Sequence, residues 1–339
     1  MKKLLAFAAA ISLCCLAHSQ EADGPGSKAE VTIVPRLDLN YNSDGNFHFG
    51  QSSIYTLLEG NLSESLSFTL LNNWFDMSLD TPASPYTNLL YSNDNNLFAL
   101  ANISYNIENW TFTLGKDCLT TAGIEYEEWD WNIYSPLATP LWNNLPSYQW
   151  GLKAAWNSPD EMHCVSLQAT TSPYGERPFA SGLYAASLQW LYGDIEDTAF
   201  KANVSALEYE KGEYDLLMCL GAKFSLGFAE VEADYHNTYG DYRPFTDYER
   251  MWSGHTGALS FKFPFTDSFS FTAKGIYSTT EKEFAGDYAL WTAGGILEYS
   301  PDFDCGIKPV FHAYGAYNSL DEGFELSAGV RIPLNFVLF

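Results

Sequence analysis

The C-terminal stretch from Glu322 to Phe339 alternates between two kinds of residue. Every second position is apolar, namely Phe324, Leu326, Ala328, Val330, Ile332, Leu334 and Phe336. The positions between them are polar or small as far as Arg331. Because successive side chains of a strand point to opposite faces, the pattern predicts a strand over 322–336 with one wholly apolar face. Phe339 has the parity of Arg331, so either a bulge precedes it or it lies beyond the strand.

The same alternation recurs from Glu30 onward and predicts about sixteen strands in all. They lie near 30–41, 50–62, 65–77, 96–107, 110–117, 147–156, 162–170, 182–192, 198–208, 214–226, 227–238, 255–265, 267–278, 288–299, 304–317 and 322–336. An apolar face repeated on every strand needs an apolar solvent, and strands can meet lipid only in a closed barrel.

The connections between these strands alternate in length. Short turns near 63–64, 108–109, 157–161, 193–197, 226–227, 266 and 300–303 alternate with long segments at 42–49, 78–95, 118–146, 171–181, 209–213, 239–254, 279–287 and 318–321. This rhythm is typical of a transmembrane antiparallel barrel with periplasmic turns and extracellular loops. A soluble β-sandwich would explain the strands but would not need the asymmetry.

The N-terminus carries a targeting pattern. Two lysines precede an apolar run from Leu4 to Leu16, and Ala17-His18-Ser19 has the small-x-small form of a cleavage site. We therefore expect a signal peptide over 1–19 and a single barrel domain over 20–339. A lipoprotein signal is disfavoured because Leu13 and Cys14, rather than small residues, precede the two early cysteines.

Composition agrees with a membrane barrel. Aromatic residues make up 16 % of the chain and charged residues only 17 %, while the net charge is −25. The aromatics recur at strand ends, as in interfacial girdles, and the acidic balance disfavours a nucleic-acid partner. The cysteines beyond the signal are widely spaced, and a single neighbouring pair, His163 and Cys164, does not supply the ligands of a metal site, so we expect neither a metal site nor a cofactor. We expect the bacterial outer membrane as location and its lipid as a partner.

Assigning the apolar set to lipid points the alternate residues into the lumen. This places eight basic side chains inward: Arg36, Lys153, Lys201, Lys223, Lys262, Lys274, Lys308 and Arg331. Since the last strand must close on the first, five of them are predicted to form a basic arc, namely Lys262, Lys274, Lys308, Arg331 and Arg36. The alternative is that they pair with Asp38, Glu230, Glu232, Asp234 and Glu325 in a wet lumen.

The longest connection is the third long loop, from Cys118 to Pro146. It holds Glu125, Glu127, Glu128 and Asp130 among several tryptophans and tyrosines. The aromatic content favours a loop folded into the barrel, with its carboxylates forming a pore constriction opposite the basic arc. Opposed charges at close range would produce a strong transverse field. The alternative is a solvated acidic tip outside the barrel.

The block from Trp110 to Asp117 (WTFTLGKD), followed by Gly123 to Glu127 (GIEYE), resembles the block "strand, Gly-Lys, then Gly-x-Glu-Tyr" of Bacteroidetes outer-membrane porins, which are similar to the phosphate-selective porin O/P family. The resemblance implies that Lys116 marks the end of the fifth strand and that Glu125 begins the constriction loop. The third loop is acidic, however, which disfavours phosphate as the solute. The chain end also resembles the terminal aromatic signal that delivers barrels to the barrel-assembly machinery.

We therefore expect an outer-membrane porin: a water-filled channel for passive diffusion of ions and small hydrophilic solutes. The alternative is a non-conducting structural or surface-adhesion barrel. An outer-membrane enzyme is disfavoured because no histidine lies in a nucleophile motif. The oligomeric state stays open, with a homotrimer among the alternatives, because lipid-facing and subunit-facing strands look alike in sequence.

Overall fold

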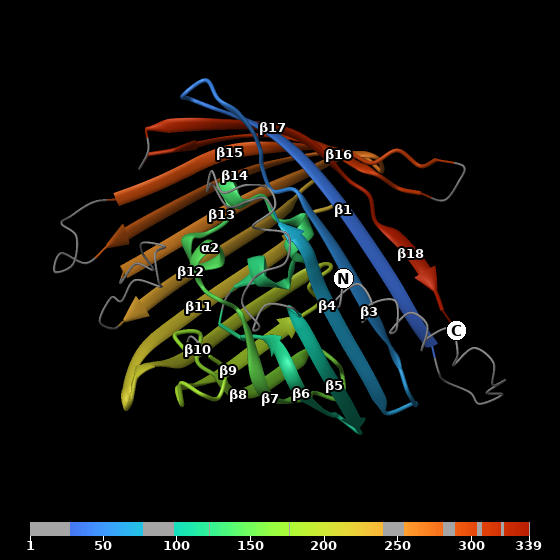
Figure 1. Cartoon of the computed structure of the whole chain (residues 1–339), viewed down its shortest axis with the longest axis vertical. Helices are drawn as coiled ribbons and strands as arrows, with labels where there is room; N and C mark the ends of the chain where they lie inside the picture. The colour runs from blue at the N-terminus through green and yellow to red at the C-terminus, as the bar shows by residue number, and fades with distance from the viewer. Residues whose placement is uncertain are drawn as a thin grey trace.

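The structure of the chain is a computed structural model that describes residues 28–76, 98–121, 123–175, 177–239, 254–280, 289–303, 307–319 and 322–338. Its strands form a closed antiparallel barrel of 16 strands (Figure 1). The fold class predicted from the alternation is confirmed. The signal peptide expected over 1–19 lies outside the described residues.

The barrel strands follow one another round the wall in chain order. They are β1 (Lys28–Asn42), β3 (Ser53–Asn61), β4 (Leu66–Asp76), β5 (Leu100–Ile107), β6 (Trp110–Cys118), β7 (Tyr148–Asn157), β8 (His163–Thr171), β9 (Tyr184–Gly193), β10 (Thr198–Glu210), β11 (Glu213–Ser225), β12 (Glu230–Tyr239), β13 (Gly254–Thr266), β14 (Phe269–Thr280), β15 (Ala289–Tyr299), β16 (Val310–Asn318), and a last strand in two parts, β17 (Gly323–Arg331) and β18 (Leu334–Val337). A short strand, β2 (Phe47–Phe49), pairs with the end of β1.

The first and last strands close the barrel in one continuous register. Arg36 pairs with Arg331 in β17, and Ile33 pairs with Leu334 in β18, so no residue is inserted between the two parts. The ladder is interrupted only where Pro35 and Pro333 stand, because proline has no N–H to donate. The register excludes a bulge before Val337, where β18 ends. Phe339 itself lies outside the described residues.

The two faces of the wall differ as the parity argument requires. On β1, Leu37 and Leu39 are exposed while Arg36, Asp38 and Asn40 are buried. The same alternation holds on β8 to β11, where apolar side chains face outward and Ser, Gln, Asn and Lys face inward. The outer face is therefore suited to lipid, and the polar face is the inner wall.

Two connections differ from the predicted rhythm. The segment 209–213, predicted as a long loop, is a tight turn of Lys211 and Gly212, and the positive φ of Gly212 (85°) permits it. The strand predicted over 304–317 begins only at Val310, and the described residues 307–309 before it are not in a strand. Pro309 stands directly before the strand, a position that proline tolerates.

In the residues that the structure describes, helices occur only as short pieces between β6 and β7. They are η1 (Ile124–Glu127), η2 (Asp130–Asn132), η3 (Ser135–Leu137) and α2 (Pro140–Asn144). No helix in the described part of the chain is long and apolar enough to cross a membrane. Cys118, Cys164 and Cys219 are free thiols, while Cys305 lies outside the described residues.

Candidate pore constriction

The connection between β6 and β7, which we term the loop segment 119–147, packs against inward-facing residues of the wall. Figure 1 shows its short helices within the ring of strands. The segment is folded by one-turn helices that begin near Pro136 and Pro140, and Thr139 caps α2 by accepting a hydrogen bond from the Trp142 N–H at 3.3 Å. Proline suits the first turn of a helix because no donor is needed there.

Apolar side chains of the segment pack on three parts of the wall. Leu141 and Leu145 contact Leu207 and Leu217 of β10 and β11. On the β1 to β5 side, Trp131 joins a cluster that includes Val34, Tyr55 and Leu71. A third cluster joins loop and wall residues near β15 and β16: Tyr134, Leu137, Ile296, Tyr314 and Ala316. The segment therefore reaches wall strands that lie far apart round the barrel.

Asp234 of β12 binds the start of η1 through backbone groups. Its two carboxylate oxygens accept hydrogen bonds from the N–H groups of Ile124 at 2.6 Å and Glu125 at 2.9 Å. Gly123 allows this approach, since a Cβ at that position would stand 1.9 Å from Asp234 Oδ1. A charged acceptor satisfies two N–H groups that a helix start leaves free.

Glu125 makes the next contact, with β14. Its side chain is buried, and Lys274 Nζ donates to its Oε1 at 2.5 Å. The Thr139 N–H donates to the same carboxylate at 3.1 Å. Burial alone raises the pKa of Glu125, but the Lys274 ammonium and these hydrogen bonds hold it below the usual value of 4.5. Glu125 is thus an ion-paired residue that fixes η1 to the wall.

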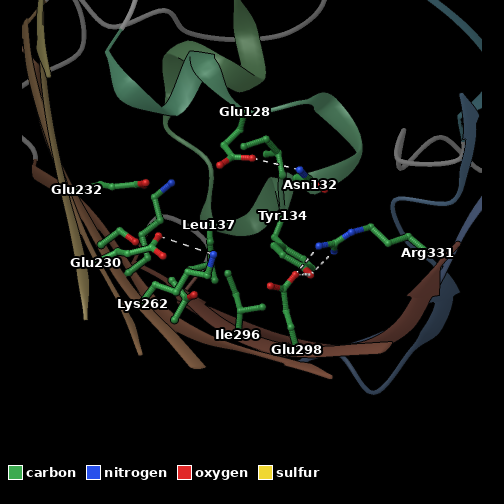
Figure 2. Close-up of a pocket in the computed structure, with 14 residues that line it drawn as sticks. Glu128, Asn132, Tyr134, Leu137, Glu230, Glu232, Lys262, Ile296, Glu298 and Arg331 are labelled. Carbon is green, nitrogen blue, oxygen red and sulfur yellow. Dashed lines mark hydrogen bonds and ion pairs between the residues drawn. The ribbon is translucent and has the colours of Figure 1, made fainter. Parts of the chain in front are cut away.

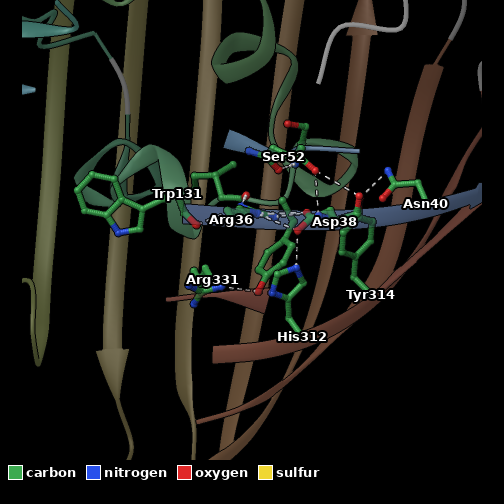
Figure 3. Close-up of polar contacts among 12 residues, drawn as sticks. Arg36, Asp38, Asn40, Ser52, Trp131, His312, Tyr314 and Arg331 are labelled. Carbon is green, nitrogen blue, oxygen red and sulfur yellow. Dashed lines mark hydrogen bonds and ion pairs between the residues drawn. The ribbon is translucent and has the colours of Figure 1, made fainter. Parts of the chain in front are cut away.

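Arg36 of β1 binds the other end of the segment (Figure 3). Its Nη1 donates to the backbone oxygens of Trp131 at 3.0 Å and Ile133 at 2.6 Å. Its Nη2 donates to Asp38 at 2.8 Å, and Asp38 also lies 2.8 Å from His312 Nε2 on β16. The side chains of Arg36, Asp38 and His312 are all buried. Together these three wall residues form one polar cluster that binds two carbonyl groups of the loop segment.

Arg331 reaches the segment through Tyr134. The Arg331 Nη1 donates to Tyr134 Oη at 2.7 Å, and Nη2 donates to Glu298 of β15 at 2.6 Å. Tyr134 Oη in turn donates to Glu298 at 2.7 Å. The Arg36 guanidinium stacks over the same ring, with 4.8 Å between Cζ and the ring centroid.

The remaining predicted acidic residues separate into different environments. Glu127 forms an ion pair with Lys201 of β10, whose Nζ also donates to the Gly123 carbonyl at 3.1 Å. Asp130 accepts from Tyr148 Oη of β7 at 2.7 Å. Glu128 is exposed, and Asn132 Nδ2 donates to it at 3.2 Å. The four carboxylates therefore do not form one acidic face.

The predicted basic arc is only partly assembled. Arg36, Lys274 and Arg331 all bind the loop segment, while Lys262 lies 3.8 Å from Glu230 on the neighbouring strand. The inward position predicted for Lys308 is wrong: it precedes β16, is exposed, and pairs with Asp302 at 3.5 Å. The ion pairs of this region agree with the alternative given in the sequence analysis. Basic side chains of the wall pair there with Asp38, Glu230 and Glu232.

A pocket of about 160 Å³ lies between the loop segment and the wall of β12 to β15 and β17 (Figure 2). Four of its lining residues are acidic and three are basic. The acidic ones are Glu128, Glu230, Glu232 and Glu298, and the basic ones are Lys262, Lys274 and Arg331. The pocket is therefore lined by charges of both signs, unlike the mostly apolar lining of a typical small-molecule site.

Sequence reasoning missed the residues that connect loop and wall. Asp234, Thr139 and Glu298 were not expected to contact the segment, although Asp234 has the inward parity. Tyr134 was noted only as an aromatic. Wall residues of this kind could be predicted by looking for polar side chains on the inward face of strands that lie opposite an aromatic-rich loop. Among the described residues, no group of three or more His, Cys, Asp or Glu side chains could hold a metal ion.

Comparisons with known proteins support the fold. No family model matches the sequence, and no curated protein matches it. The structure is similar to the trimer form of OmpT, an outer membrane protein of Vibrio cholerae (TM-score 0.59, 12% identity, covering 91% of this chain and 100% of that chain). It is also similar to the outer membrane channel DcaP of Acinetobacter baumannii (0.58, 12%, 92% and 98%) and to OpdO of Pseudomonas aeruginosa (0.52, 10%, 93% and 98%). At such identities the likeness shows a shared outer-membrane barrel fold.

Proposed function

We propose that this chain is a porin of the bacterial outer membrane, forming a water-filled channel for ions and small hydrophilic solutes. The observation that carries the proposal is the charged pocket between the loop segment 119–147 and the inner wall of a closed barrel. Contacts of the segment with β1, β12 and β14 hold it against that wall. Passage then follows the pocket, and the segment is its constriction.

Single-channel recording in planar bilayers tests this function. The full chain, refolded in detergent and checked by the heat-dependent gel mobility of a closed barrel, is expected to give discrete conductance steps. Correctly folded protein without any conductance would instead support the alternative, a non-conducting structural or adhesion barrel. The absence of an enzymatic activity stays a prediction.

Two further parts of the proposal concern partners. The exposed apolar band, with residues such as Leu37, Leu114 and Leu167, suits contact with membrane lipid. A homotrimer would cover part of the same band, and one similar structure is described as a trimer form. Cross-linking of the chain in outer-membrane vesicles would distinguish trimer from monomer. Delivery by the barrel-assembly machinery remains a prediction from the terminal strand.

A further inference from the structure

The charges at the pocket are unevenly paired. Arg331 pairs with Glu298 at 2.6 Å, and Lys274 pairs with Glu125 at 2.5 Å. Each of these basic side chains is largely buried, and its nearest carboxylate neutralises it at short range. Neither pair adds a net charge to the passage.

The wall of β11 to β13 is balanced in the same way. Lys223 lies 3.2 Å from Glu232, and both Lys223 and Lys262 lie within 4 Å of Glu230, at 3.9 Å and 3.8 Å. Two lysines thus face two carboxylates across neighbouring strands. The wall side of the pocket is therefore close to neutral, although it is rich in charge.

Glu128 differs from every other charged residue that lines the pocket. It is exposed, it stands on the loop side in Figure 2, and among the described residues it forms no ion pair. Its hydrogen bond comes from Asn132 Nδ2, a neutral donor, at 3.2 Å. The negative charge that remains once the pairs are counted is therefore the charge of Glu128.

Resting on the porin function proposed above, we infer that Glu128 is the specificity-determining residue of the channel and that it makes the channel prefer small cations. A carboxylate without a basic partner attracts a passing cation and repels an anion, while the paired charges act on each other. Glu125 and Glu127, although on the same loop, serve to hold the segment through Lys274 and Lys201. The expected solutes are monovalent metal ions and small ammonium compounds.

The test is the permeability ratio of K⁺ to Cl⁻, obtained from reversal potentials in a KCl gradient. Wild-type protein is expected to give a ratio above one. For an ion passing about 6 Å from the carboxylate in water, the charge changes permeability by about threefold, in opposite directions for K⁺ and Cl⁻. Glu128→Gln should therefore lower the ratio by about tenfold, and Glu128→Lys by about that factor again. Both changes leave the paired charges and the apolar loop contacts in place.

Two control variants locate the effect. Glu64→Gln removes an exposed carboxylate in the β3–β4 turn, and Glu196→Gln removes one in the β9–β10 turn, neither of which lines the pocket. Both should leave the ratio nearly unchanged. If folded wild-type protein does not conduct, the porin function fails. If it conducts with a ratio of one or less, or if Glu128→Gln has no greater effect than the controls, the assignment to Glu128 is wrong and the porin function stands.

Discussion

Replacing Lys274 by Met should release the start of the loop segment from the wall. In the structure, Lys274 is the basic partner of the buried Glu125, at 2.5 Å. Methionine keeps the length and much of the volume of lysine but removes the charge. The carboxylate would then be left buried beside an apolar side chain, with hydrogen bonds only from the Thr139 N–H and hydroxyl.

The magnitude follows from the cost of an unpaired buried charge. Breaking a buried ion pair by removing one partner typically costs about 3–5 kcal/mol. This cost falls on the attached state of η1, because a detached η1 would expose Glu125 to water. The ratio of attached to detached loop should therefore fall by roughly two to three and a half powers of ten. The contacts of Arg36 with the Trp131 and Ile133 carbonyls remain, so the other end of the segment stays in place.

Single-channel recording provides the assay. Lys274→Met should show larger mean conductance and greater open-channel noise than wild type, because η1 no longer narrows the passage steadily. The matched control is the double variant Lys274→Met with Glu125→Leu, which removes both charges and should return the trace toward wild-type noise. Equal noise in the single variant and wild type would refute the view that this pair holds the loop.

Two further predictions concern the same attachment. Gly123→Ala should raise the open-channel noise as well, because the added Cβ would stand 1.9 Å from Asp234 Oδ1 and would disturb the contact of η1 with β12. Gly257→Ala, at a β13 position where an added Cβ meets no atom within 4 Å, is the control for general effects of losing a glycine, and equal noise in both variants would contradict the steric argument. Acid should have a parallel effect. The pKa of Glu125 is lowered on folding, so the stability that its charge adds to the attached loop is complete above the usual pKa of 4.5. This stability is lost as the pH falls through the lowered pKa. Conductance noise measured from pH 7 to pH 3 should therefore gain an increase at acid pH that is absent from the Lys274→Met, Glu125→Leu double variant, and the same acid profile in both proteins would contradict this assignment.

The sequence alone predicts the wall of this barrel well. A strand with one lipid-facing side alternates between apolar and polar residues, so each strand can be recognised from its own sequence. The sixteen predicted ranges agree with the observed strands to within a few residues for all but one. The exception is the start of β16, where the chain from 304 to 309 reads as alternating although Pro309 stands before the strand. Parity likewise predicted that Arg36, Lys274 and Arg331 would face inward.

The contacts of the loop segment were not predictable in the same way. Glu125 and Lys274 are 149 positions apart, and several inward lysines could have been the partner. Choosing among them requires the path of the loop across the barrel, which depends on apolar packing of Trp131 and Leu141 against distant strands. Local periodicity has no information on such contacts, so the sequence predicted opposed charges but not which of them neutralise each other.

The central claim is that ions pass between the loop segment and the wall of β12 to β15. Ser260 and Phe261 are neighbours on β13, and Ser260 lines the pocket while the Phe261 side chain is exposed on the outer face. In a background with Cys118, Cys164, Cys219 and Cys305 replaced by serine, a charged methanethiosulfonate reagent should reduce the current of Ser260→Cys in discrete steps. It should leave the current of Phe261→Cys unchanged. A Ser260→Cys channel that is labelled, as shown by mass spectrometry, yet conducts as before would contradict this path.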